Sequence, residues 1–192
     1  MRCSILAICL TSVLFQGYNP FWEKKPVAEW TFEELNQFLT SSPWAKSAGT
    51  RIYLATARHV REAEALLKKK RPPKDTPDDP VGSDYEDFLA ESPGKYIVLA
   101  ALLPRPDAMM DAAAAARVEE KTVMKIGKRK YHLAGHFPPS ISDPHLRLVF
   151  PRDIRPGDRI VEFELYLPSV PESYRLIFFE LKNLHFQGRL EL

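Results

Sequence analysis

Strict alternation of apolar and polar residues runs through the second half of the chain and limits what it can fold into. The segment 158–167 (DRIVEFELYL) shows it most clearly, with apolar residues at every odd position from 161 and with Glu162 and Glu164 between them. The same period of two recurs at 122–126, 130–133, 145–150, 175–181 and 186–192. Because side chains alternate between the two faces of a sheet, this pattern predicts an antiparallel sheet with one buried face.

The segment 186–192 keeps this pattern up to residue 192. Its apolar residues share one face and its polar residues the other: Phe186, Leu190 and Leu192 against Gln187, Arg189 and Glu191. The pattern predicts a paired strand whose apolar face closes the core. Gly188 interrupts that face, and we expect a bulge or a large neighbouring side chain over it.

The first half of the chain indicates helices around two strands. Thr31 and Glu34 form a capping box, which predicts a helix over 32–40. Further helices are predicted over 59–70, from Ser83 to about Ser92, and over 107–120 with Asp107 as the cap, and strands over 50–56 and 95–103. The last of these is apolar throughout, which is typical of a central strand. Together these patterns predict an α+β fold, with N-terminal helices and mixed strands and a C-terminal antiparallel β-sheet, sandwich-like or an open barrel.

The first 17 residues indicate export to the periplasm or cell envelope. The run from Cys3 to Phe15 is uncharged and mostly apolar, long enough for a signal peptide but shorter than the roughly 20 residues that span a bilayer. Cleavage after Gly17 would place the bulky Phe15 where a small residue is needed. We therefore expect either a signal peptide or an uncleaved N-terminal anchor over 1–17, with a buried strand or helix as the alternative.

The positions of the cysteines exclude several kinds of site from the part of the chain after residue 17. Both cysteines, Cys3 and Cys9, lie within the apolar run. The mature domain is therefore cysteine-free and can hold no disulfide, thiolate zinc site or cysteine nucleophile.

Beyond residue 17 we expect a Trp-rich segment over 18–48 and a single α+β domain over 49–192. The Pro- and Asp-rich stretch 72–83 predicts an exposed loop within that domain. The chain has 27 Lys and Arg against 25 Asp and Glu, a formal net charge of +2. Nucleic acid is therefore not an expected partner, and a membrane is one only through an uncleaved N-terminus.

The three tryptophans, Trp22, Trp30 and Trp44, all lie in the Trp-rich segment and are candidate binding residues. Exposed indoles could form a stacking platform for a sugar or another flat ligand. The alternative is that they clamp the segment onto the domain, because a tryptophan buries a large area.

Three of the five histidines, His132, His136 and His145, are candidate metal ligands. The i, i+4 spacing of the first two would join them on a helix, but a glycine and two prolines nearby disfavour one, and on a strand they would lie about 13 Å apart. His145, with Asp143, would have to converge with them in space. No phosphate-binding loop, nucleophile elbow, dinucleotide-binding motif or His-Glu-x-x-His motif occurs. No cofactor is therefore expected, and no catalytic residue can be assigned.

Three stretches carry a resemblance to a known family: PFWEKKPVAEWTFEELNQFLTSSPWAKSA at 20–48, LRLVFPR at 146–152 and FFELKNLHFQGRLEL at 178–192. In these stretches the chain resembles an uncharacterised family of exported acidobacterial proteins. The resemblance implies export. It carries over no activity and no catalytic residues, because the family has no known activity, and the stretch 72–83 departs from the family as an insertion.

Two hypotheses about function follow. The first is an exported, non-enzymatic interaction or binding module of the cell envelope, with an unknown protein or envelope component as its partner. The second is a metal-dependent or hydrolytic enzyme that uses the neighbourhood of His132, His136 and His145. The lack of a catalytic motif favours the first.

Overall fold

The computed structural model describes residues 20–70, 80–140 and 143–192. The expected signal or anchor over 1–17 and most of the expected loop over 72–83 lie outside these ranges. None of the helices within them combines the length and the apolar composition of a membrane span.

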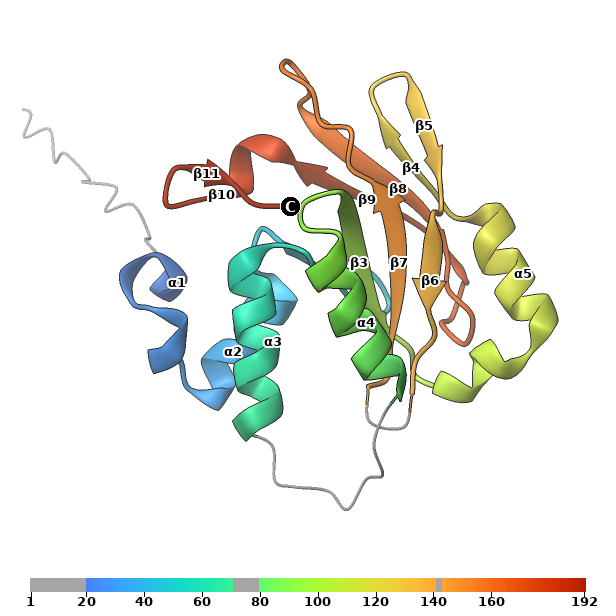
Figure 1. The fold of residues 1–192 in the computed structure, drawn as a ribbon, viewed down its shortest axis with the longest axis horizontal. Coiled ribbons are helices and arrows are strands. Elements are labelled where there is room, and N and C mark those ends of the chain that lie inside the picture. Colours follow the sequence, from blue (N-terminus) through green and yellow to red (C-terminus); the bar gives the residue numbers. More distant parts are fainter. Residues whose placement is uncertain (1–19, 71–79, 141–142) are drawn as a thin grey trace, which may run out of the picture.

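Helices occupy mainly the first two thirds of the chain (Figure 1). The α-helices are α1 (Phe21–Lys24), α2 (Phe32–Ser41), α3 (Arg58–Lys70), α4 (Pro80–Glu91) and α5 (Ala112–Lys121), and the short 3-10 helices are η1 (Val27–Glu29), η2 (Pro106–Met110) and η3 (Leu181–Asn183). The predicted capping box of α2 is confirmed. The backbone N–H of Glu34 donates to the Thr31 hydroxyl, and the N–H of Thr31 donates to the Glu34 carboxylate at 2.8 Å.

The strands form two larger antiparallel sheets and one short hairpin. The first sheet has the order β1-β2-β3-β7-β6, with β1 (Ala45–Ser47), β2 (Arg51–Leu54), β3 (Tyr96–Leu102), β7 (His145–Pro151) and β6 (Gly135–Phe137). The second has the order β5-β4-β8-β9, with β5 (Arg129–His132), β4 (Val123–Ile126), β8 (Ile160–Tyr166) and β9 (Tyr174–Glu180). The α+β class with antiparallel C-terminal strands is confirmed, and the sheets are not closed into a barrel.

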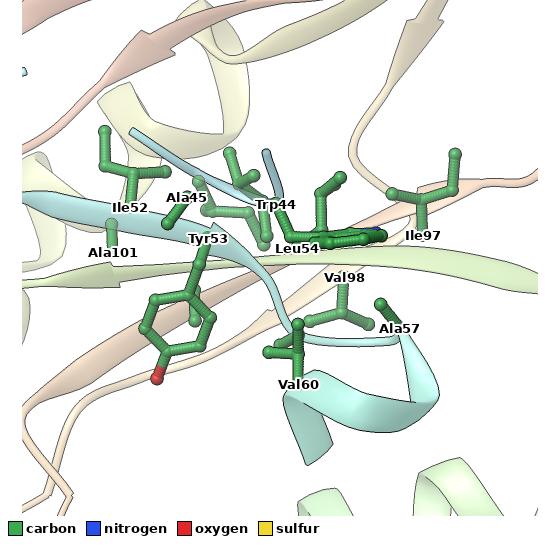
Figure 2. Packing of buried hydrophobic residues seen from close by; sticks show 14 of the residues in the cluster. Trp44, Ala45, Ile52, Tyr53, Leu54, Ala57, Val60, Ile97, Val98 and Ala101 are labelled. Atoms are coloured by element: carbon green, nitrogen blue, oxygen red, sulfur yellow. The ribbon is translucent and has the colours of Figure 1, made fainter. Parts of the chain in front are cut away.

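The first sheet lies between helices and the second sheet. One of its faces carries Ile52, Leu54 and Phe150, and the ring of Phe150 packs on Phe163 of β8 with the ring centroids 5.2 Å apart. Tyr53 points from the opposite face towards the side of α3, as Figure 2 shows. In an antiparallel sheet buried on both sides, successive residues of a strand pack against different layers. Both sets of residues are therefore apolar, which explains why β3 is apolar throughout.

Two helices differ from the expectation. In place of one helix over 107–120, the 3-10 helix η2 precedes α5, and the cap of α5 is Asp111, which accepts a hydrogen bond from the N–H of Ala113. An Asp side chain competes for backbone N–H groups and so starts a new helix at this point. Helix α4 begins at Pro80, three residues before the expected cap, because proline suits the first position of a helix.

The single strand expected over 186–192 is wrong. The structure has instead a hairpin of β10 (His185–Phe186) and β11 (Arg189–Leu190). Gln187 and Gly188 have φ of 51° and 77°, the positive values that a two-residue hairpin turn requires. Gly188 is thus a turn residue, and a Cβ placed there would meet no atom within 4 Å, so no side chain covers it.

Candidate functional site

The three candidate histidines do not come together. His132 is exposed on β5 of the second sheet, whereas His136 and His145 lie on neighbouring strands of the first. His136 pairs with Leu148, three residues beyond His145, so the two imidazoles leave opposite faces of that sheet. Nδ1 of His136 instead lies 3.5 Å from the carboxylate of Glu119. Within the described ranges, no three His, Cys, Asp or Glu side chains gather as a metal site.

Two of the three candidate tryptophans are buried. Trp30 is fully covered and Trp44 is 2% exposed, while Trp22 is partly buried. The Trp30 indole N–H donates to the carbonyl of Lys25 at 3.1 Å, and that of Trp44 to the carbonyl of Glu191 at 2.9 Å. A ligand could stack on Trp30 or Trp44 only after the core had opened.

A cavity of about 450 Å³ with charged side chains in its wall lies between α3, α4 and the first sheet. Its floor comes from β2 and β7, and the two helices supply most of its walls. It is lined by both apolar and charged side chains: Leu39, Arg51, Tyr53, Arg58, Arg61, Glu62, Glu64, Ala65, Leu67, Lys68, Tyr85, Glu86, Leu89, Asp143, His145 and Arg147. Only His145 among these is one of the histidines singled out from the sequence.

Strand register brings the polar floor together. Tyr53 of β2 and Arg147 of β7 both pair with Ala100 of β3, so the three residues form one row across the sheet. The small side chain of Ala100 leaves room above it, and the two longer side chains reach the same carboxylate on α3. The Tyr53 hydroxyl donates to Glu64 at 2.6 Å, and Nη2 of Arg147 donates to the same carboxylate oxygen at 3.0 Å.

Arg147 is the centre of this network and is only 8% exposed. Besides its bond to Glu64, Nη2 donates to Asp143 at 2.8 Å. The guanidinium carbon lies 4.2 Å from the ring centroid of Tyr85 on α4, which is cation–π geometry. One buried positive charge thus faces two carboxylates.

Asp143 also binds His145. Nδ1 of the imidazole lies 2.5 Å from Oδ1 of Asp143, and the backbone N–H of His145 donates to the same oxygen at 3.2 Å. Burial alone would raise the pKa of Asp143, but the hydrogen bond with His145 and the charge of Arg147 hold that pKa well below its usual range. Asp143 is therefore a fixed anion that orients the imidazole.

Both tyrosines keep their protons. Burial, reinforced by the Glu64 carboxylate, raises the pKa of Tyr53 well above its usual value. Burial likewise raises the pKa of Tyr85. Both hydroxyls are therefore hydrogen-bond donors at any physiological pH.

Three buried polar atoms in this network have no hydrogen-bond partner in the part of the chain that the structure describes: Tyr85 Oη, His145 Nε2 and Arg147 Nη1. A buried polar group left without a partner costs about 1–3 kcal/mol, and native proteins contain few. The three atoms are covered, but the side chains that carry them all line the cavity. Unpartnered polar groups beside a cavity mark it as a candidate ligand site.

Further cations line the cavity. Arg51, Arg61 and Lys68 form no ion pair with any described residue. Counted over the whole lining, five side chains are cationic and four acidic. One negative charge on a ligand would balance the lining.

Sequence reasoning missed most of this site. The predicted helix over 59–70 has Val60, Ala63 and Leu67 on one face, and nothing in that pattern assigned a role to Glu64 or Arg61. The available signal was Arg147, a charged residue within an otherwise apolar strand, HLRLVF, in which every residue is buried. A buried arginine must be paired, so its presence indicated acidic partners elsewhere in the fold.

Comparison of the chain with protein-family models, with curated proteins and with solved structures gives no significant match in any of the three.

Proposed function

We propose that this protein is an exported binding module of the cell envelope that takes a small carboxylic acid into the cavity between α3, α4 and the first sheet. The observation that carries the proposal is that two side chains lining the cavity each keep a buried donor without a partner, Nη1 of Arg147 and the hydroxyl of Tyr85. A small shift of either side chain would bring its donor to a ligand in the cavity. A carboxylate accepts hydrogen bonds from both kinds of donor.

The charge of the lining supports a monoanion. Arg147 is already shared by two carboxylates, Glu64 and Asp143, so the floor has no excess positive charge for a phosphate dianion. The lining as a whole carries one cation more than it has acids, which a single carboxylate balances. Leu39, Leu67 and Leu89 give the rest of the ligand an apolar surface, and the volume lies within the range of small-molecule sites, about 300–1,000 Å³.

Export is supported by the sequence. The apolar run at 3–15 and the resemblance to an exported acidobacterial family both favour the periplasm or cell envelope. An envelope protein that receives or delivers the ligand is the partner we propose. Cell fractionation tests this part of the proposal, and intact protein found only in the cytosol would contradict it.

Binding is tested with benzoate, hexanoate and inorganic phosphate, by calorimetric titration of the full chain. We expect the two carboxylates to bind and phosphate to bind more weakly or not at all. Tyr85→Phe removes only the unpartnered hydroxyl, so it should leave the unbound protein at least as stable as before while weakening carboxylate binding by roughly 10- to 100-fold. Arg147 is less suitable for substitution, because its removal would leave Glu64 and Asp143 buried and unpaired.

Tyr131→Phe is the matched control. Tyr131 lies on β5, outside the cavity, and its hydroxyl binds Asp153. Carboxylate affinity should be the same in this variant as in the wild type. If neither carboxylate binds, or if Tyr85→Phe and Tyr131→Phe bind equally well, the proposed site is wrong.

A further inference from the structure

We infer that the protein forms a two-fold symmetric dimer in which β9 of one copy pairs antiparallel with β9 of a second copy, so that their second sheets join into one continuous sheet. The inference goes beyond the proposed function and is independent of it, because the cavity lies on the first sheet and β9 belongs to the second. Three features of β9 support it: exposed apolar side chains, a free backbone edge and a sequence that is complementary to itself.

Exposed large apolar side chains gather on one face of the second sheet. Five such side chains occur in the part of the chain that the structure describes, and four of them lie on β8 and β9: Ile160, Tyr174, Leu176 and Phe178. The strand register places all four on the face opposite to Phe163, which packs on the first sheet. An exposed apolar patch of this kind on a soluble domain marks an interaction surface.

The patch lies where a sheet normally carries charges. Strand β9 is an edge strand of the second sheet, whose order is β5-β4-β8-β9. Edge strands of monomeric proteins are commonly protected by charged side chains, proline or bulges. On this face the charges lie further inward, where Glu162 and Glu164 of β8 form ion pairs with Lys125 of β4, while the middle of β9 carries Leu176 and Phe178. The edge is thus unprotected against pairing with another strand.

The backbone of β9 can pair along this edge. The N–H of Leu181, the residue after β9, donates to the carbonyl of Arg159 at 2.9 Å, so these two residues form a hydrogen-bonded pair of the ladder with β8. Bonded pairs alternate in an antiparallel ladder, so the odd-numbered residues of β9 bond to β8. The even-numbered residues, among them Leu176 and Phe178, point their N–H and C=O groups outward. No described residue hydrogen-bonds to these groups of Leu176 and Phe178.

One antiparallel register pairs β9 with itself along its whole length. When Ile177 of one copy lies opposite Ile177 of the other, every residue from Tyr174 to Glu180 has a partner. Leu176 then lies opposite Phe178 of the second copy as a hydrogen-bonded pair, and the two-fold axis repeats the contact. The Cβ atoms of such a pair are about 4.5–5.5 Å apart. The exposed apolar side chains of the two copies therefore cover one another.

Charge complementarity favours the same register. Two residues beyond the ends of the paired segment, the exposed Lys182 of one copy comes beside the exposed Glu172 of the other, and the two-fold axis repeats this pair. A shift of two residues in one direction would instead bring Glu180 beside Glu172, two like charges. The opposite shift would place Glu180 across from Leu176. Opposite charges at a contact fix its register, and like charges disfavour it.

Sedimentation velocity of the full chain tests the dimer. A contact of one strand from each copy belongs to the small, weak interfaces, so we expect monomer at about 1 µM and dimer at about 500 µM. At the lower concentration, urea unfolding measures the single chain. Leu176→Lys places a charge at the centre of the contact and leaves the ladder with β8 intact, so this variant should stay monomeric at both concentrations.

Ile160→Lys is the matched control. It introduces the same charge on the same face but one strand inward, at a position that edge pairing leaves uncovered, so it should dimerise like the wild type. Loss of the dimer in both variants would show that the copies pack face to face and would overturn the inference. A wild type that stays monomeric at the higher concentration, or a dimer that survives Leu176→Lys, would overturn it too.

Disulfide cross-linking tests the register without the lysine variant. In a Cys3→Ser/Cys9→Ser background, Leu176→Cys and Phe178→Cys chains are mixed and oxidised. Hydrogen-bonded partners have Cα atoms about 5.5 Å apart, within disulfide range, so the mixture should form a cross-linked dimer. Two copies of residue 176 are diagonal neighbours about 7–8 Å apart, so Leu176→Cys alone should cross-link far less. No cross-link in the mixture, or equal cross-linking of Leu176→Cys alone, would contradict the pairing.

Discussion

The imidazole of His59 stacks on the ring of Phe186, with centroids 4.4 Å apart and an angle of 19° between the planes. His59 is fully buried, and neither of its ring nitrogens has a hydrogen-bond partner within the described ranges. Phe38 and Trp44 contact the same imidazole in T-shaped geometry. A histidine is thus the centre of the apolar contact between the N-terminal segment, α3 and the C-terminal hairpin.

This burial makes stability depend on pH. Burial, with a smaller effect of Arg58, lowers the pKa of His59 from 6.5 to about 3. Between these values the unfolded chain binds a proton at this residue and the folded protein does not, so the free energy of unfolding falls as the pH falls, by about 1.4 kcal/mol per unit. We expect His59→Leu to flatten this slope in urea unfolding between pH 6.5 and 4.

The control for this prediction is His185→Gln, which removes an exposed histidine and should keep the wild-type slope. The range ends at pH 4 because carboxylates with lowered pKa, such as Asp143, lose their contribution only below about that pH. If the free energy of unfolding depends equally on pH in His59→Leu and in the wild type, His59 can be protonated in the folded protein and the prediction is wrong.

Substitution of Leu192 tests whether the chain after the C-terminal hairpin belongs to the core. Its side chain is 2% exposed, whereas Leu176 on β9 is 53% exposed. We expect Leu192→Ala to lower the free energy of unfolding by about 2–5 kcal/mol, the range for a buried leucine. Leu176→Ala makes the same chemical change on the surface and should stay within about 0.5 kcal/mol of the wild type. Similar midpoints for the two variants in urea would mean that Leu192 does not belong to the core.

Substitution of Trp30 tests whether this side chain anchors the N-terminal segment to the rest of the domain. It is fully buried, and its ring centroid lies 4.7 Å from that of Phe38. Trp30→Ala should cost about 3–5 kcal/mol, while Phe32→Ala, at a residue that is 44% exposed, should cost little. Thermal melts of both variants provide the comparison. A shift of less than about two degrees for Trp30→Ala, where 1 kcal/mol corresponds to roughly 2–4 °C, would contradict the anchoring role.

Substitutions at two glycines allow the cost of backbone strain and the cost of steric conflict to be measured separately. Gly49 and Gly94 have φ of 74° and 71°, but a Cβ on Gly49 would lie 2.7 Å from Nη2 of Arg175, and one on Gly94 would meet nothing within 4 Å. Arg175 cannot move freely, because its Nε donates to the carbonyl of Ala48 at 2.6 Å.

Gly94→Ala should therefore cost only the left-handed penalty, about 1–2 kcal/mol. Gly49→Ala should cost more, by about the 1–3 kcal/mol typical of an overpacked contact. Urea unfolding of the two variants measures the difference. Equal costs would indicate that Arg175 moves aside without loss.

Elements with local signals could be predicted from the sequence. The capping box of α2 involves residues only three apart, and the apolar run at 95–103 allows no position for β3 other than the middle of a sheet. The hairpin at 187–188 was missed because the alternation continues through it. A positive φ at Gln187, a residue with no strong preference for one, gives no local sign of a turn.

The candidate site depends on register, which no local pattern determines. Arg147 and Glu64 are 83 residues apart and meet only because Tyr53, Ala100 and Arg147 align across three strands. His145 was identified as a candidate from its residue type. Its partner in the structure is Asp143, two residues away. His136 leaves the opposite face of the same sheet, because one-residue steps along a strand reverse the face, and His132 lies on the second sheet.

The hydrogen bond from Trp44 to the Glu191 carbonyl spans 147 residues. At translation rates of about 5–20 residues per second, the indole waits roughly 7–30 s for its partner to be synthesised. Until then the aromatic cluster around Trp44 lacks the hairpin that covers it and stays open to chaperones. In a chain that is exported as we propose, this delay would keep the polypeptide unfolded while it is handed to the translocation machinery, without a separate device to slow folding.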